Sequence, residues 1–391
     1  MIDAERIEKN LEGISFPRLS GTEHEQQASK LIIQKIEELG LNPEIQKFSF
    51  TTFYPRVYKK LAFCSIWWLL VVFFLYINII FILINIVILS IIFVPLIIIT
   101  RHPEDISLGE KYQSENVCIK LDAKVPNHTA EKSNKIQFLL LSHKDSKCQK
   151  LTITFRSINT KVWIYSFIII VALLILKYFF ISNIIFNLII ACILLLNLIS
   201  TVLILVNTTN NKSPGAIDNG SGVSLVLELL HHFNKIENRL TSIDLWFIFT
   251  GAEENGTMGI RYLYRKHKQE WHHQTTRYLN FDSIGTHLDV FAVKNKGEHT
   301  SLFKLFADLS EELDPSYYIK YFIFALNRSD GYYLKNKNYK GIGFADKKAY
   351  KYIHSPKDTV DKVDHSFLAQ FGRVLITLLE EYDKKISKPY S

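Results

Sequence analysis

Two long stretches without charge most constrain what this chain can fold into. Leu61–Thr100 contains no charged residue, and Val162–Val206 contains one, Lys177. A single helix over the first stretch would be about 60 Å long, twice the ~30 Å hydrocarbon core of a bilayer. Each stretch is therefore predicted to form two membrane spans joined by a tight turn, near Tyr76–Asn85 in the first hairpin and near Lys177–Asn183 in the second. The alternative, two apolar core segments of a soluble protein, is disfavoured by the length of the uncharged runs.

The rest of the chain is long enough for one α/β domain. Removing the hairpins, 61–100 and 162–206, leaves residues 1–60, 101–161 and 207–391 as its three segments. No secretory signal peptide is predicted, because residues 1–60 are polar and amphipathic, so the first hairpin is expected to act as the membrane signal. The four cysteines show no paired spacing, which predicts neither a disulfide framework nor a cysteine metal site.

Positive charge gathers beside the predicted spans and accounts for much of the net charge of +8. The first hairpin is flanked by Arg56, Lys59, Lys60 and Arg101, and the second by Lys144, Lys147, Lys150, Arg156, Lys161 and Lys212. The turns inside the hairpins carry at most Lys177. The positive-inside rule then predicts a multi-pass membrane protein whose polar domain is cytoplasmic. The expected partner is the lipid bilayer. Nucleic acid is not expected, because no nucleic-acid-binding motif accompanies the charge, and the oligomeric state is left open.

The polar segments alternate between strand and helix patterns. Helical periodicity covers residues 4–14 and 23–43, and strand patterns cover residues 44–53, 115–123, 135–143, 243–251 and 277–285. A short polar turn between 115–123 and 135–143 predicts that these two strands pair antiparallel. The alternation along the rest of the chain predicts a three-layer α/β/α domain with a mostly parallel sheet.

Acids and histidines follow the predicted strands one after another. The candidate ligands are His143, Asp145, Asp218, Glu253, Glu254, Asp282 and His354. In an open α/β sheet such residues meet at the carboxyl ends of the strands. Taken singly, each is typical of a turn former, a helix cap or a hydrogen-bonded histidine. Taken together they predict a site for zinc or a similar divalent metal, because carboxylate and imidazole suit that ion. The adjacent Glu253 and Glu254 are expected to differ in role, one coordinating metal and the other moving a proton.

The order of these motifs resembles peptidase family M28, the co-catalytic zinc aminopeptidases. The motifs are His-x-Asp, Gly-Ala-x-Asp-Asn-x-Ser-Gly, Glu-Glu-Asn-Gly, Asn-x-Asp and His-Ser-Pro-x-Asp, and the resemblance runs from "RLSGTEHEQQASKLI" to "HSPKDTVDKVD". It implies a zinc aminopeptidase-like fold with two inserted transmembrane hairpins. The implied activity is hydrolysis of amino-terminal residues from peptide substrates with two zinc ions.

The resemblance also implies a role for each candidate residue. His143 and Asp282 would hold one zinc, and Glu254 and His354 the other. Asp218 would bridge the two ions. Glu253 would be the general base, and Asp145 would orient the imidazole of His143.

The sequence departs from the family pattern at two positions. Ile260 stands where the family usually has serine, and Gly331 stands where a histidine often follows Ser-Asp. Neither is a proposed ligand, so they bear on substrate preference rather than on hydrolysis. The larger departure is the second hairpin, which leaves just after Asp145 and returns just before Asp218. The site is therefore expected to face the membrane and to trim peptides at its surface.

Three alternatives remain at this point. A glutaminyl cyclase would share the fold with a single zinc, and an assay for cyclisation of amino-terminal glutamine distinguishes it. A non-catalytic membrane scaffold would have lost ligands, whereas every ligand position here is filled. A small transporter or channel would need ionisable residues along its spans, and only Lys177 is present. Asn-x-Ser/Thr sequons in the chain are interpreted as chance occurrences, since Asn219 and Asn255 adjoin the proposed ligands.

Overall fold

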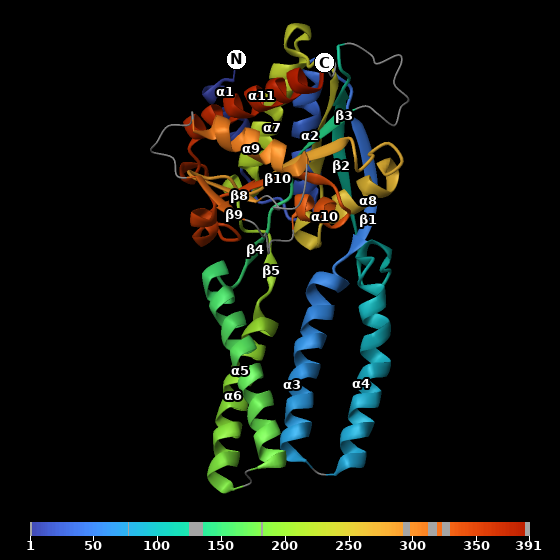
Figure 1. The fold of residues 1–391 in the computed structure, drawn as a ribbon, viewed down its shortest axis with the longest axis vertical. Helices are drawn as coiled ribbons and strands as arrows, with labels where there is room; N and C mark the ends of the chain where they lie inside the picture. The colour runs from blue at the N-terminus through green and yellow to red at the C-terminus, as the bar shows by residue number, and fades with distance from the viewer. Residues whose placement is uncertain are drawn as a thin grey trace. The chain divides into compact units, whose positions relative to one another are not determined.

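The structure, a computed structural model, describes residues 2–76, 78–124, 136–180, 183–291, 298–311, 319–322 and 329–387 (Figure 1). The chain divides into two compact units. The sheet unit consists of Met1–Ser49, Tyr112–Cys148 and Asn211–Ser391, and the helical unit consists of Phe50–Lys111 and Gln149–Asn210. Each unit is therefore assembled from segments that are far apart in the sequence.

The sheet unit is built on an eight-stranded sheet in the order β1-β2-β6-β3-β7-β10-β8-β9. In that order the strands are Glu44–Thr51, Lys111–Leu121, Ile243–Thr250, Ile136–His143, Thr276–Phe281, Lys340–Ala345, Leu288–Phe291 and Ile319–Phe322. Neighbours β6, β3, β7 and β10 are all parallel, and β8 pairs parallel with β9. Strand β2 runs antiparallel to β6, and β8 runs antiparallel to β10. The prediction of a mostly parallel sheet is confirmed.

The predicted pairing of β2 with β3 is wrong. Strand β6 lies between them and pairs with both, from Val117 opposite Phe249 on one side and from His143 opposite Thr250 on the other. Every residue of β6 is buried, and a strand of that kind is stabilised at the centre of a sheet rather than at its edge. The burial of β6 between β2 and β3 is therefore more favourable than a direct hairpin between those two strands, which the short connection had suggested. The direction was predicted correctly, because β2 still runs opposite to β3.

Helices cover both faces of the sheet and complete three layers. The helices of this unit are α1 (Ala4–Ile14), α2 (Glu23–Glu37), α7 (Ser221–Asn234), α8 (Met258–His267), α9 (Glu298–Ser310), α10 (Asp330–Asn336) and α11 (His365–Ser387). On one face, Phe138 of β3 packs edge-on against Tyr382 of α11. On the other face, Leu139 and Leu141 of β3 share a core with Leu263 of α8 and Leu334 of α10. Consecutive strand residues thus reach opposite layers, as the two-residue period of a strand requires.

The helical unit contains α3 (Lys59–Leu75), α4 (Ile79–Ile99), α5 (Ile153–Phe179) and α6 (Ile184–Val206). A π-helical turn, Phe53–Tyr58, precedes α3 and continues into it. Four helices of the described chain are long and apolar enough to cross a membrane: Phe53–Leu75, Ile79–Ile99, Ile153–Phe179 and Ile184–Val206. Because α4 already begins at Ile79, the first connection lies at the start of the predicted turn region. The two-residue strands β4 (Cys148–Gln149) and β5 (Thr209–Asn210) pair beside α5 and α6.

Polar side chains join α5 to α6 inside this unit. The Asn197 side chain donates hydrogen bonds to the Ser166 hydroxyl at 2.8 Å and to the Trp163 carbonyl at 3.0 Å. The indole N–H of Trp163 donates in turn to the Thr201 hydroxyl at 3.0 Å. All four residues are buried. Interhelical hydrogen bonds of this kind hold helices together where apolar surroundings offer no other partner.

Candidate metal centre

Three parallel strands deliver most of the candidate ligands to one edge of the sheet. His143 is the last residue of β3, and Asp282 directly follows β7. Glu253 begins a short 3-10 turn, Glu253–Asn255, just after β6. Since β6, β3 and β7 are neighbouring parallel strands, their carboxyl ends meet, and the side chains that follow them lie together.

The two remaining ligands come from loops. Asp218 lies in the turn Ala216–Gly220 that leads into α7. The Asp358 carboxylate accepts hydrogen bonds from the N–H groups of Ile217 at 2.6 Å and of Asp218 at 3.3 Å, which fixes that turn. His354 adopts a left-handed backbone conformation with φ of 58°. Such a conformation is uncommon outside glycine and persists where the surroundings enforce it.

The donor atoms form two groups that share one carboxylate. Nε2 of His143 lies 3.1 Å from Oδ1 of Asp218 and 3.8 Å from Oδ1 of Asp282. Nε2 of His354 lies 2.9 Å from the other oxygen, Oδ2, of Asp218 and 3.0 Å from Oε1 of Glu254. Within each group the ligand atoms lie within 4.8 Å of one another. Each oxygen of Asp218 therefore faces a different histidine.

The donor set fits a pair of divalent cations. Nitrogen and oxygen donors in each group match the ligands of zinc. Oε1 of Glu254 is buried and accepts no hydrogen bond from a described residue, although a buried carboxylate oxygen normally has a partner. It faces His354, within the second donor group. A cation bound there would interact with this oxygen and with Nε2 of His354, which lies 3.0 Å from it.

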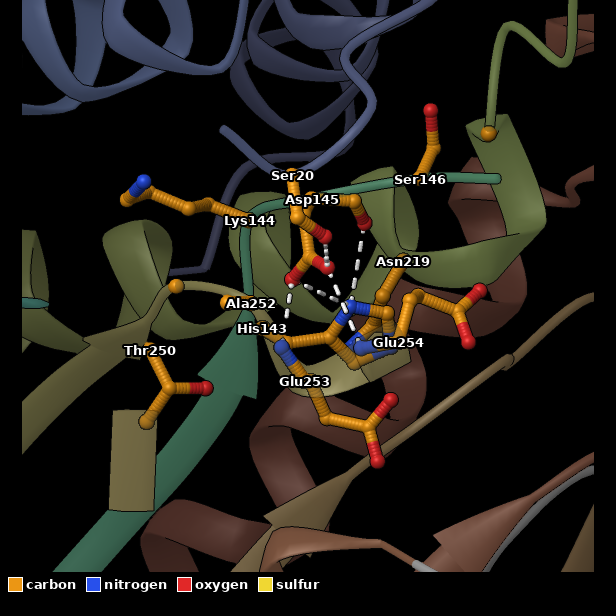
Figure 2. Close-up of polar contacts among 12 residues, drawn as sticks. Ser20, His143, Lys144, Asp145, Ser146, Asn219, Thr250, Ala252, Glu253 and Glu254 are labelled. Atoms are coloured by element: carbon orange, nitrogen blue, oxygen red, sulfur yellow. Dashed lines mark hydrogen bonds and ion pairs between the residues drawn. The ribbon is translucent and has the colours of Figure 1, made fainter. Parts of the chain in front are cut away.

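Asp145 ties the β3 loop to the turn that carries the adjacent glutamates (Figure 2). Its carboxylate accepts hydrogen bonds from the Ser20 hydroxyl at 2.5 Å and from the N–H groups of Glu253 and Glu254, both at 3.1 Å. Nδ1 of His143 lies 3.0 Å from the Asp145 carbonyl oxygen and 3.5 Å from Oδ1. Burial acts to raise the pKa of Asp145, but the contacts with His143 and Ser20 outweigh it and lower the pKa to about 2. Asp145 is therefore an ionised anchor for both segments.

The side chains of the adjacent glutamates diverge. Figure 2 shows their carboxylates at different positions, and Glu254 belongs to the second donor group. Burial, opposed by His143 and reinforced by the Glu254 and Asp282 carboxylates, raises the pKa of Glu253 well above its usual value. A glutamate whose pKa is raised suits proton transfer. The two acids thus occupy environments that fit different roles.

Two residues of this region were not predicted as part of the site. Lys147 was counted only among the charges that flank a span, yet its ammonium pairs with Oε2 of Glu254, and its side chain is only 16% exposed. Asp330 is buried and accepts a hydrogen bond from the Thr250 hydroxyl, and burial raises its pKa to about 7. The available signal for Lys147 was its position two residues after Asp145, in the same strand-end loop.

Arg18 connects the loops that carry His143 and Asp218. Its guanidinium is fully buried and donates to the carbonyls of Lys144 at 2.6 Å and Gly215 at 2.8 Å, with further bonds to the carbonyls of Phe16 and Pro214. Burial lowers the pKa of Arg18 to about 10 against the pull of nearby acids, including Asp358. It therefore stays charged at neutral pH. Through Arg18, the amino-terminal segment thus holds the two loops together.

Comparison with known protein families decides the identity of this fold. Residues 204–379 match the family model described as peptidase family M28. This chain carries an M28 peptidase domain. The match includes Asp218, Glu253, Glu254, Asp282 and His354. It does not include His143 or the loop that follows β3. The resemblance predicted from the motifs is confirmed, and so is the assignment to a family of zinc-dependent peptidases.

Solved structures show the same fold at low sequence identity. The aminopeptidase from Aneurinibacillus sp. strain AM-1 superposes with a TM-score of 0.56 and 15% identity, over 97% of this chain and 93% of that one. BSAP, a zinc aminopeptidase from Bacillus subtilis, gives 0.56 and 12%, over 98% and 96%. An Acidobacteriales bacterium glutaminyl cyclase gives 0.56 and 11%, over 98% and 96%. No curated protein sequence matches the chain significantly.

Proposed function

We propose that the protein is a membrane-anchored di-zinc aminopeptidase that removes amino-terminal residues from peptides. The observation that carries this proposal is the position of Asp218, whose two oxygens face His143 at 3.1 Å and His354 at 2.9 Å. A carboxylate shared in this way is suited to bridging two cations. Zinc bound at the two groups would polarise the scissile carbonyl and make the attacking water more acidic.

The proposed roles follow the two donor groups. His143 and Asp282 would hold one ion, Glu254 and His354 would hold the other, and Asp218 would be shared by the two groups. Glu253 takes a proton from the attacking water and passes it to the leaving amine. Asp145 positions His143 through the contacts with its ring nitrogen and positions Glu253 through its backbone N–H.

A single-zinc glutaminyl cyclase is the second candidate, because a solved cyclase shares the fold. Its transfer reaction would use only one donor group. The presence of both groups within hydrogen-bonding distance of Asp218 favours the peptidase. A non-catalytic scaffold is disfavoured by the complete donor set.

Membrane anchoring and sidedness are also part of the proposal. The four long apolar helices support anchoring in a bilayer. The basic residues beside them support a cytoplasmic catalytic domain by the positive-inside rule. The loop that carries Asp145 continues along the chain into α5, which begins at Ile153, and for this reason we propose peptides at the membrane surface as substrates. Protease treatment of intact cells should leave the domain undigested, whereas digestion from outside would contradict this topology.

The central experiment combines metal analysis with substrate assays on the purified full-length protein. We expect two zinc ions per chain and release of the amino-terminal residue from aminoacyl substrates, abolished by a chelator and restored by zinc. One ion per chain together with cyclisation of amino-terminal glutamine would instead identify a cyclase. Two bound ions without either activity on a broad substrate panel would contradict the aminopeptidase.

A further inference from the structure

A cavity with basic and polar side chains in its walls lies within the helical unit, at the ends of its helices. Its volume is about 450 Å³, and all its lining residues belong to this unit. This is in the range of sites that hold small organic ligands, and it exceeds what a single phosphate ion would fill. Arg56, Lys59, Lys60 and Arg156 line it, together with the buried amide of Asn159.

The residues that line the cavity carry positive charge. They come from two segments, residues 55–60 and 149–209, and none of them is an aspartate or a glutamate. Basic side chains that share a partly enclosed space attract anions, and the attraction increases as water is excluded.

Backbone dipoles add to the same field. The helix that runs from Phe53 through Leu75 and helix α5 both begin at the cavity, where Arg56 and Arg156 lie in or near their first turns. The amino-terminal end of a helix carries partial positive charge, which favours phosphate and similar anions. The charge of the side chains, the helix ends and the cavity therefore all favour phosphate or a similar anion.

The cavity also has an apolar part, and it lies at the ends of the apolar helical segments. Leu203 and Ile204 of α6 contribute to its lining. Lys60 directly precedes the uncharged run that begins at Leu61, and α6 ends at Val206. If the helices span a bilayer, as the proposed function holds, the cavity lies at the level of the lipid headgroups. A phosphate would meet the cations there, and the glycerol end of a lipid would meet the leucine and isoleucine.

We propose that this cavity is a binding site for the phosphate-bearing headgroup of an anionic phospholipid. Basic pockets between membrane helices are known to hold such headgroups. The site is separate from the peptidase chemistry and rests on the membrane anchoring in the proposed function. Its ligand is distinguished from free phosphate by the need for the glycerol and acyl portion.

The test measures lipid binding to the purified full-length protein in mild detergent by native mass spectrometry. We expect phosphatidylglycerol to bind about tenfold or more tightly than phosphatidylcholine, and R56Q/R156Q to lose that preference. R101Q/K161Q is the matched control, because it removes the same charge from the same unit but outside the cavity, and it should keep the preference within about twofold. R56K/R156K retains charge and should also keep it, which separates a charge effect from misfolding.

Three results would overturn the proposal. Equal binding of both lipids by the unmodified protein would do so, and so would equal loss in R56Q/R156Q and R101Q/K161Q. Displacement of phosphatidylglycerol by equimolar inorganic phosphate would identify a free-phosphate site instead. Alkaline extraction of the membranes distinguishes the two proposals: release of the protein contradicts anchoring and the headgroup site together, whereas retention with equal lipid binding contradicts the headgroup site alone.

Discussion

The Lys147 ammonium pairs with one carboxylate oxygen of Glu254 and leaves the other oxygen 3.0 Å from Nε2 of His354. Glu254 is thereby oriented to offer a single oxygen, Oε1, to the second donor group. Burial acts to lower the pKa of Lys147, but the Glu254 carboxylate outweighs it and the pKa lies above its usual value. Lys147 is therefore a cation that positions a proposed metal ligand and offsets part of the negative charge of the site.

Replacement of Lys147 by leucine should make stability depend more strongly on zinc. The change leaves the Glu254 carboxylate buried without its cation, which costs about 3–5 kcal/mol in comparable buried pairs. We expect the metal-free K147L protein to melt at lower temperature than the metal-free unmodified protein, and zinc to recover part of the difference. Thermal unfolding with and without zinc measures this. K150L, which removes an exposed lysine nearby, should leave both unfolding curves unchanged. Equal unfolding curves for K147L and K150L would show that Lys147 does not stabilise the site.

Replacement of Glu253 by glutamine should stop turnover without removing metal. The change deletes only the group that accepts a proton, so we expect a loss of several orders of magnitude in kcat with about two zinc ions still bound. Metal content and kcat measured on one preparation test this. Asp218→Ala is the contrasting variant, because it removes the carboxylate common to both groups and should lose metal as well. Near-normal turnover by E253Q would show that another group moves the proton.

Replacement of Arg18 by lysine should loosen the loops beneath the site. Lysine cannot reproduce the planar fork that donates to the carbonyls of Lys144 and Gly215. Buried carbonyl groups would lose their donors, at a cost of about 1–3 kcal/mol each. We expect a lower melting temperature and weaker zinc binding, measured by zinc titration in the presence of a competing chelator. The exposed change K30Q should affect neither, and retention of full zinc affinity by R18K would limit Arg18 to a purely structural role.

Stability should fall between pH 6.5 and pH 4 in part because of His232. Burial, with the charge of Lys235, lowers the pKa of His232 to about 4 in the folded chain, whereas an unfolded histidine titrates near 6.5. The unfolded state therefore binds a proton first as pH falls. The stability present above pH 6.5 is lost as pH approaches 4, by an amount on the order of 1 kcal/mol. H232Q should flatten this part of the melting temperature profile relative to H24Q, which changes an exposed histidine. Superimposable profiles would contradict this assignment.

Much of the site could be predicted from sequence because its ligands lie close to elements that local patterns identify. His143, Glu253 and Asp282 each follow an apolar strand, and parallel neighbouring strands end at the same edge of a sheet. The motif order was enough to place these residues together without knowledge of the strand order. The apolar runs likewise predicted four long helices, because hydrophobic length is a property of the sequence alone.

The tertiary structure alone decided which distant segments became neighbours. Strand β6 entered between β2 and β3, and Arg18 reached the carbonyls of Lys144 and Gly215 across 126 and 197 residues of chain. Lys147 gave no local sign that its partner would be Glu254, 107 residues away. Local patterns reveal which residues are buried or follow a strand, but partners are selected by the burial of whole faces and by the need to pair each buried charge. Those requirements are satisfied only when the complete chain is packed.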